Sequence, residues 1–199
     1  MTDRHECLDS TMLDQLFRKA RSHNAWTGRA VSDETVRAIY DLAKWGPTAA
    51  NGNPARFVFI RSEQAKARLL PHVNPTNVEK VRQAPCTVII AADTRFHELF
   101  PKLFPSRDMR SVFEGNDALI ADTIARSSTL QGAYLMMAAR ALGLDCGPMS
   151  GFDQAGTDAE FFPDGRWKSN FLCNIGYGDP EALFPRNPRL DFEEACLDL

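Results

Sequence analysis

GPTAANGNPARFVFI, residues 46–60, is a loop with glycine and proline that leads from an amphipathic segment into a short apolar run. Pro47 and Pro54 fix φ and carry no N–H, and Gly52 can adopt a positive φ. The loop also carries short polar side chains that can hydrogen-bond either the backbone or a ligand, namely Thr48, Asn51 and Asn53. The β-prone run at 57–60 can anchor the loop on a sheet. These residues leave two interpretations open, a binding loop or an ordinary connection between a helix and a strand.

Hydrophobic periodicity on either side of this loop predicts a mixture of helices and strands. Apolar residues at helical spacing indicate helices over residues 11–20, 33–45, 62–70 and 118–142. Ser32 is placed to cap the second of these, and Gly143 to end the last. Continuous apolar runs at 57–60, 86–92 and 169–177 indicate strands, the middle one buried on both faces. Residues 74–83 are polar, which predicts a loop position for Asn77, and GPMSG at 147–151 predicts a turn.

Residues 96–113 alternate phenylalanines with prolines and are too irregular for one long helix. Within this segment Arg107 and Arg110 flank Asp108. Such a cluster is a solvated salt-bridge group in one interpretation and a clamp for an anionic ligand in the other.

Length and charge exclude several classes of protein. The 199 residues fit one domain, 1–199, with a sizeable core. A net charge of −3 and a pI near 5.8 provide no field for nucleic acid or an anionic membrane, so neither is an expected partner. The five cysteines show no C-x-x-C spacing, which argues against a zinc site and fits a reducing cytoplasm. No apolar run reaches the ~18 residues of a membrane span, and the first ten residues are too polar for a signal peptide.

Familiar nucleotide and metal motifs are absent from the sequence. There is no glycine-rich phosphate loop and no G-x-G-x-x-G after a strand, which argues against a Rossmann nicotinamide site. The histidines lack metal-ligand spacing, so no metal is expected and most of them are expected at the surface: His5, His23, His72 and His97.

Four separated segments, taken in order, together resemble the FMN-dependent nitroreductase family. They are RSHNAW at 21–26, the loop at 46–60, LDCGPMSGFD at 144–153 and PRNPRLDFEE at 185–194. The resemblance covers nearly the whole chain, from Asp9 to Leu199. It implies an α+β fold, with a central, mostly antiparallel sheet flanked by helices. It also implies a homodimer with FMN at the subunit interface, and NADH or NADPH as electron donor.

The resemblance further implies which residues bind FMN. Arg21, Ser22 and Arg189 would hold the phosphate, Asn77 would bind the pyrimidine edge, and backbone amides near Gly151 would face the redox-active ring nitrogen. The complete implied set is Arg21, Ser22, His23, Thr48, Asn51, Asn53, Asn77, Pro148, Met149, Ser150, Gly151, Arg186 and Arg189. Asn24 and Asn187 stand where the family usually has basic residues, and Arg186 can compensate for the second of these.

Within the family, KWGPTAAN at 44–51 and ALGLDCGPMSGFD at 141–153 are most similar to the malonic semialdehyde reductase branch of pyrimidine degradation. This similarity implies reduction of malonic semialdehyde to 3-hydroxypropanoate. Arg107 or Arg110, in a segment that would cover the flavin, then becomes the candidate for binding the substrate carboxylate. Two alternatives stay open, a broad-specificity nitro or quinone reductase and a flavin-binding protein without catalytic activity.

Overall fold

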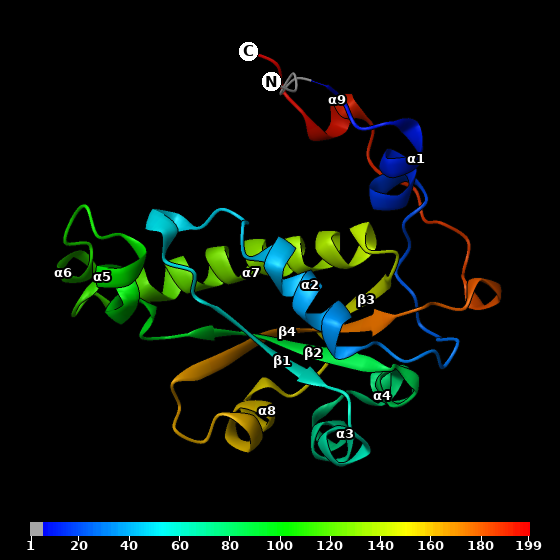
Figure 1. The fold of residues 1–199 in the computed structure, drawn as a ribbon, viewed down its shortest axis with the longest axis horizontal. Coiled ribbons are helices and arrows are strands. Elements are labelled where there is room, and N and C mark those ends of the chain that lie inside the picture. The colour runs from blue at the N-terminus through cyan, green and yellow to red at the C-terminus, as the bar shows by residue number, and fades with distance from the viewer. Residues whose placement is uncertain (1–5) are drawn as a thin grey trace.

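The computed structural model describes residues 6–199 and places a four-stranded antiparallel sheet between two layers of helices (Figure 1). The strands are β1 (Ala55–Ile60), β2 (Cys86–Asp93), β3 (Asp145–Met149) and β4 (Trp167–Gly176), in the order β1-β2-β4-β3. The helices are α1 (Ser10–Leu13), α2 (Asp33–Ala43), α3 (Glu63–Leu69), α4 (Pro75–Gln83), α5 (Phe100–Leu103), α6 (Arg110–Phe113), α7 (Asp117–Ala141), α8 (Gln154–Phe161) and α9 (Phe192–Ala195). Shorter turns are η1 (Asp14–Arg18), η2 (Ala49–Asn51), η3 (Leu70–His72), η4 (Phe96–Leu99) and η5 (Pro180–Ala182). None of the helices in this described range is both long and apolar enough to cross a bilayer.

The two faces of the sheet bury separate hydrophobic clusters. Helices α2 and α7 cover one face, where Val88 and Ile90 of β2 meet Leu135 of α7. Helices α3, α4 and α8 cover the other face, where Ile89 packs in a cluster with Leu69. Every residue of β2 is buried because successive side chains point to opposite faces and both faces are covered. The prediction of a doubly buried strand at 86–92 is therefore confirmed.

The long helices follow their predicted signals closely. The Ser32 side chain accepts a hydrogen bond from the Thr35 amide at the start of α2. Helix α7 extends over the predicted range, and Gly143 follows it with a φ of 78°, a left-handed conformation that suits glycine at a helix end. The first predicted helix, 11–20, forms as α1 continued by the π-helical turn η1 and ends at Arg18.

Two elements near the predicted motifs differ from expectation. Asn77 lies in helix α4 and not in a loop, because Pro75 starts that helix at a position where its missing N–H costs nothing. The stretch at 147–151 predicted only a turn, but its first three residues belong to β3, which therefore contains Pro148. A proline is tolerated there because β3 is an edge strand of the sheet.

Candidate functional site

Several of the predicted cofactor-binding residues lie along β3 and the turn that follows it. Ser22 forms an isolated bridge with Cys146 of β3, and the His23 amide donates to the Cys146 carbonyl at 3.0 Å. Beyond the strand, the Gly151 carbonyl accepts from Asn77 Nδ2 at 3.2 Å and from the Asn74 amide at 3.1 Å. Residues from the N-terminal segment and from α4 therefore both contact β3 or the turn that follows it, although more than 120 positions separate Ser22 from Gly151 in the sequence.

Two backbone donors in this group are available to a ligand. Within residues 6–199, the amides of Ser150 and Gly151 make no hydrogen bond. Gly151 has no side chain to shield them, and a Cβ built there would lie 2.6 Å from Asn77 Nδ2. Neighbouring main-chain N–H groups of this kind can stabilise negative charge on a bound ring or oxyanion without depending on a rotamer.

Lys80 belongs to the same group, and sequence reasoning missed it. Its Nζ donates to Asn77 Oδ1 at 3.0 Å, so it fixes which end of the amide faces Gly151. The two side chains meet because residues three apart on a helix share one face. Once Asn77 is placed in a helix, that spacing is the signal that identifies Lys80.

The His23 side chain fits neither of the two expectations for it, a surface position or a place in the FMN-binding set. Its side chain is 7% exposed, and its Nε2 lies 3.3 Å from Asp145 Oδ1. The ring packs closely against Gly178, so it points into the protein, whereas the neighbouring Ser22 is exposed. The prediction that most histidines lie at the surface is wrong for the residues described, because His23 is buried and His72 and His97 are half-buried. His5 lies outside the described residues.

Two arginines from distant segments meet beside the N-terminal motif. Arg21 donates to the Phe184 carbonyl, and Arg186 Nη2 donates to the Ala20 carbonyl at 2.7 Å. Arg189 is exposed and donates to carbonyls of its own tail, Asn187 and Pro188. This geometry favours Arg186 over Arg189 as the partner of Arg21.

Thr48, Asn51 and Asn53 form a second group at a different place. Thr48 Oγ1 accepts from the Asn53 amide at 3.2 Å, and Asn53 Nδ2 donates to the Asn51 carbonyl at 2.7 Å. Asn51 Nδ2 also donates to the Leu103 carbonyl in α5 at 2.8 Å. In Figure 1 this loop lies toward α5 and α6, whereas α4 and β3 lie toward the opposite end of the sheet.

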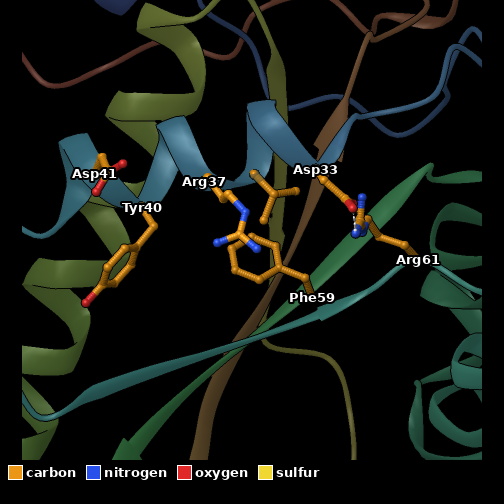
Figure 2. Close-up of a pocket in the computed structure, with 7 residues that line it drawn as sticks. Asp33, Arg37, Tyr40, Asp41, Phe59 and Arg61 are labelled. Carbon is orange, nitrogen blue, oxygen red and sulfur yellow. Dashed lines mark hydrogen bonds and ion pairs between the residues drawn. The ribbon is translucent and has the colours of Figure 1, made fainter.

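Two surface cavities run along the outer edge of β1. One, of about 550 Å³, lies between α2 and β1 and is lined by charged and aromatic side chains; Figure 2 labels Asp33, Arg37, Tyr40, Asp41, Phe59 and Arg61. The other, of about 540 Å³, shares Tyr40 and Phe59 with the first and includes Asn51 and Asn53. Neither is lined by residues of the group around β3.

The arginines of the irregular segment are both exposed. Arg110 pairs with Glu114 one helical turn away at 3.2 Å, while Asp108 accepts from the Ser111 amide. The structure records no ion pair between Asp108 and either flanking arginine, so the alternative of an Arg-Asp-Arg salt-bridge cluster is not formed. For the part of the chain described, the Arg107 guanidinium has no ion pair or side-chain hydrogen bond.

The fold defines an α+β protein, and its similarity to known proteins identifies the family. The family model described as "Nitroreductase family" matches residues 17–177. A Rhodopseudomonas palustris protein named "Putative NADH dehydrogenase/NAD(P)H nitroreductase" is 70% identical over 184 residues, which cover 92% of this chain and 94% of that protein. A protein of the same name from Ralstonia nicotianae is 58% identical, covering 95% and 97%. The chain belongs to the nitroreductase family.

Solved structures agree with the fold. A "putative nitroreductase in complex with FMN" from Exiguobacterium sibiricum superposes with a TM-score of 0.84 at 22% identity, covering 98% of this chain and 99% of that one. A nitroreductase family protein from Streptococcus pneumoniae gives a TM-score of 0.82 at 21% identity, covering 93% and 98%. The predicted nitroreductase-like fold is confirmed, and FMN as cofactor agrees with the family and with the Exiguobacterium sibiricum complex.

Proposed function

We propose that this protein is an FMN-dependent NAD(P)H oxidoreductase whose flavin lies against the end of β3. The observation that carries the proposal is the pair of unused amides at Ser150 and Gly151, beside the Asn77 side chain. Bound FMN supplies the hydride chemistry, and the chain supplies binding, orientation and electrostatics. Asn77 would bind the pyrimidine edge, Arg21 and Arg186 the phosphate, and the two amides would stabilise charge on the reduced ring.

The proposed active unit is a homodimer. The group around β3 and the loop group of Thr48, Asn51 and Asn53 share no hydrogen bond and lie toward opposite ends of the sheet. If both groups contact one flavin, as the family resemblance implies, they come from different copies of the chain. The loop of one copy then completes the site at β3 of the other.

The surface supports this assembly. Strand β1 is the other edge of the sheet, with unpaired backbone groups beside the two cavities. Residues 184–199 are all exposed, and Phe184, Leu190 and Phe192 there are 65–71% exposed. Large apolar side chains on an extended arm are typical of an interface with another chain.

Flavin titration tests the proposed function directly. The protein should bind FMN with quenching of flavin fluorescence and should be a dimer by light scattering. Arg21→Ala should weaken binding by about tenfold or more, because one charge-assisted partner of the phosphate is lost. Arg68→Ala is the matched control, since Arg68 of α3 is an exposed arginine paired with Glu160 of α8. A monomer that leaves the fluorescence unchanged would contradict the proposal.

We further propose malonic semialdehyde as the substrate, with the Arg107 guanidinium binding its carboxylate. A three-carbon acid has little apolar surface, so burial at about 25 cal/mol per Å² cannot hold it tightly, whereas a guanidinium can bind a carboxylate bidentately. Arg107 is preferred over Arg110 because Arg110 is engaged by Glu114. The names of the relatives favour a second candidate, a broad nitro or quinone reductase.

Substrate comparison separates these candidates. Arg107→Ala should lower kcat/KM for malonic semialdehyde by about tenfold or more, and leave that for an uncharged quinone nearly unchanged. Arg110→Ala should have a smaller effect, and Lys102→Ala, an exposed cation in the same segment, serves as the control. Equal losses on both substrates would favour the broad reductase. Bound FMN without NAD(P)H turnover would indicate a non-enzymatic flavin protein.

A further inference from the structure

A buried carboxylate lies where β2 ends. Asp93 is 2% exposed and accepts from Arg56 Nη2 at 2.7 Å through one oxygen and from Arg166 Nε at 2.9 Å through the other. The Arg95 amide donates to the same group at 2.9 Å. Burial opposes ionisation, but these hydrogen bonds and the Arg56 charge outweigh it and hold the pKa of Asp93 below its usual value. The carboxylate therefore binds two cations, Arg56 of β1 and Arg166 from the turn just before β4, and its Oδ2 accepts from both.

One of these cations supports the loop at 48–53. Arg56 Nη1 donates to the Asn53 carbonyl at 3.0 Å and to the Ala55 carbonyl at 2.9 Å. The Asp93 amide donates to the Pro54 carbonyl at 2.9 Å. Within this loop Ala50, Asn51 and Asn53 have φ values of 50°, 54° and 44°. Non-glycine residues adopt this left-handed region only where the surroundings enforce it, so the loop conformation depends on its supports.

The other cation supports the segment at 96–113. Arg166 Nη2 lies 3.1 Å from Glu98 Oε2 in η4, where that segment begins. The segment also contacts the loop directly, because Asn51 donates to the Leu103 carbonyl. The Phe96 ring packs so closely on Gly52 that a Cβ there would lie 2.8 Å from it. Loop and segment are thus joined at their contact surface, and both are anchored to Asp93.

We propose that Asp93 is a positioning residue that holds the loop at 48–53 and the segment at 96–103 in one fixed arrangement through Arg56 and Arg166. This role rests on the proposed function, in which the loop at 48–53 contributes to flavin binding and the segment at 96–103 to substrate binding. The arrangement needs both oxygens of a carboxylate, because an asparagine amide offers one acceptor oxygen and its NH2 group faces the second guanidinium.

Hydrogen exchange of the protein without added FMN tests the arrangement independently of activity. Asp93→Asn should speed amide exchange severalfold in both segments, and Glu98→Gln should speed it at 96–103 alone. Asp93→Glu keeps the charge and should restore part of the protection. Glu160→Gln, which removes the exposed Arg68–Glu160 pair, is the control and should change neither segment. The proposal is wrong if Asp93→Asn speeds exchange uniformly over the chain, or in neither segment. If that variant does not fold, Glu98→Gln still tests the proposal. Unchanged exchange at 96–103 in Glu98→Gln would show that Arg166 does not hold this segment through Glu98.

Steady-state and binding measurements extend the test to the flavin-loaded protein. Asp93→Asn should weaken FMN binding about tenfold and raise the substrate KM, whereas Glu98→Gln should raise KM with FMN affinity unchanged. Identical effects of the two variants on FMN affinity and KM would contradict the division of roles. If the unaltered chain binds no FMN but exchange rises in the expected segments, the proposed function fails while the positioning role of Asp93 stands.

Discussion

Gly151→Ala is expected to weaken FMN binding by about tenfold or more while changing the free energy of unfolding by less than about 1 kcal/mol. A Cβ at this position would lie 2.6 Å from Asn77 Nδ2 and 3.2 Å from Asn74 Nδ2. Both atoms are the ends of side chains that can rotate away, and Gly151 does not have a left-handed φ, so the fold accommodates the methyl group. FMN affinity falls because the methyl group displaces the Asn77 side chain from its position beside the flavin edge.

Fluorescence titration and urea unfolding measure these two effects separately. If the methyl group acts through Asn77, the double variant Gly151→Ala/Asn77→Ala should bind FMN about as weakly as Asn77→Ala alone. Additive losses would mean that the methyl group blocks the flavin directly. If Gly151→Ala leaves FMN affinity unchanged, the flavin does not bind at the end of β3.

Strong local signals were sufficient to predict most of the fold. Helices α2 and α7 have caps and apolar faces, and β2 is an uninterrupted apolar run, so each was predictable from its own residues. Strand β3 and helix α4 were not, because Pro148 and the polar composition of 74–83 each argue against the element that forms. Only its place at the sheet edge lets β3 include a proline.

The candidate site was predictable in composition but not in arrangement. Motif residues such as Arg21, Asn77 and Gly151 stand out in the sequence by resemblance. Their supports do not, because these depend on contacts between distant positions: Arg166 is 73 residues from Asp93, and Arg186 is 166 residues from Ala20. Composition also gave no reason to expect that the loop and β3 groups lie apart within one chain.

Gly147→Ala should lower both stability and FMN affinity more than Gly151→Ala does, because its methyl group would contact a backbone atom. A Cβ at Gly147 would collide with the His23 carbonyl oxygen, where the N-terminal segment crosses β3. That oxygen cannot rotate away as an amide side chain can, so the 22–23 segment must leave the strand. Forcing extra volume into a closely packed position of this kind costs about 2–3 kcal/mol of unfolding free energy.

The same displacement moves Ser22 and Arg21 away from Arg186, so FMN affinity should fall by about a hundredfold or more as two phosphate contacts are lost. Urea unfolding and FMN titration of Gly147→Ala and Gly151→Ala, measured together, give the matched comparison. Each change adds one methyl group, in the middle of β3 for Gly147 and just beyond the end of β3 for Gly151. A stability loss confined to Gly147→Ala therefore assigns the difference to the backbone contact with His23. Equal stability losses would mean that the N-terminal segment is not held by β3, and the phosphate site would have to lie elsewhere.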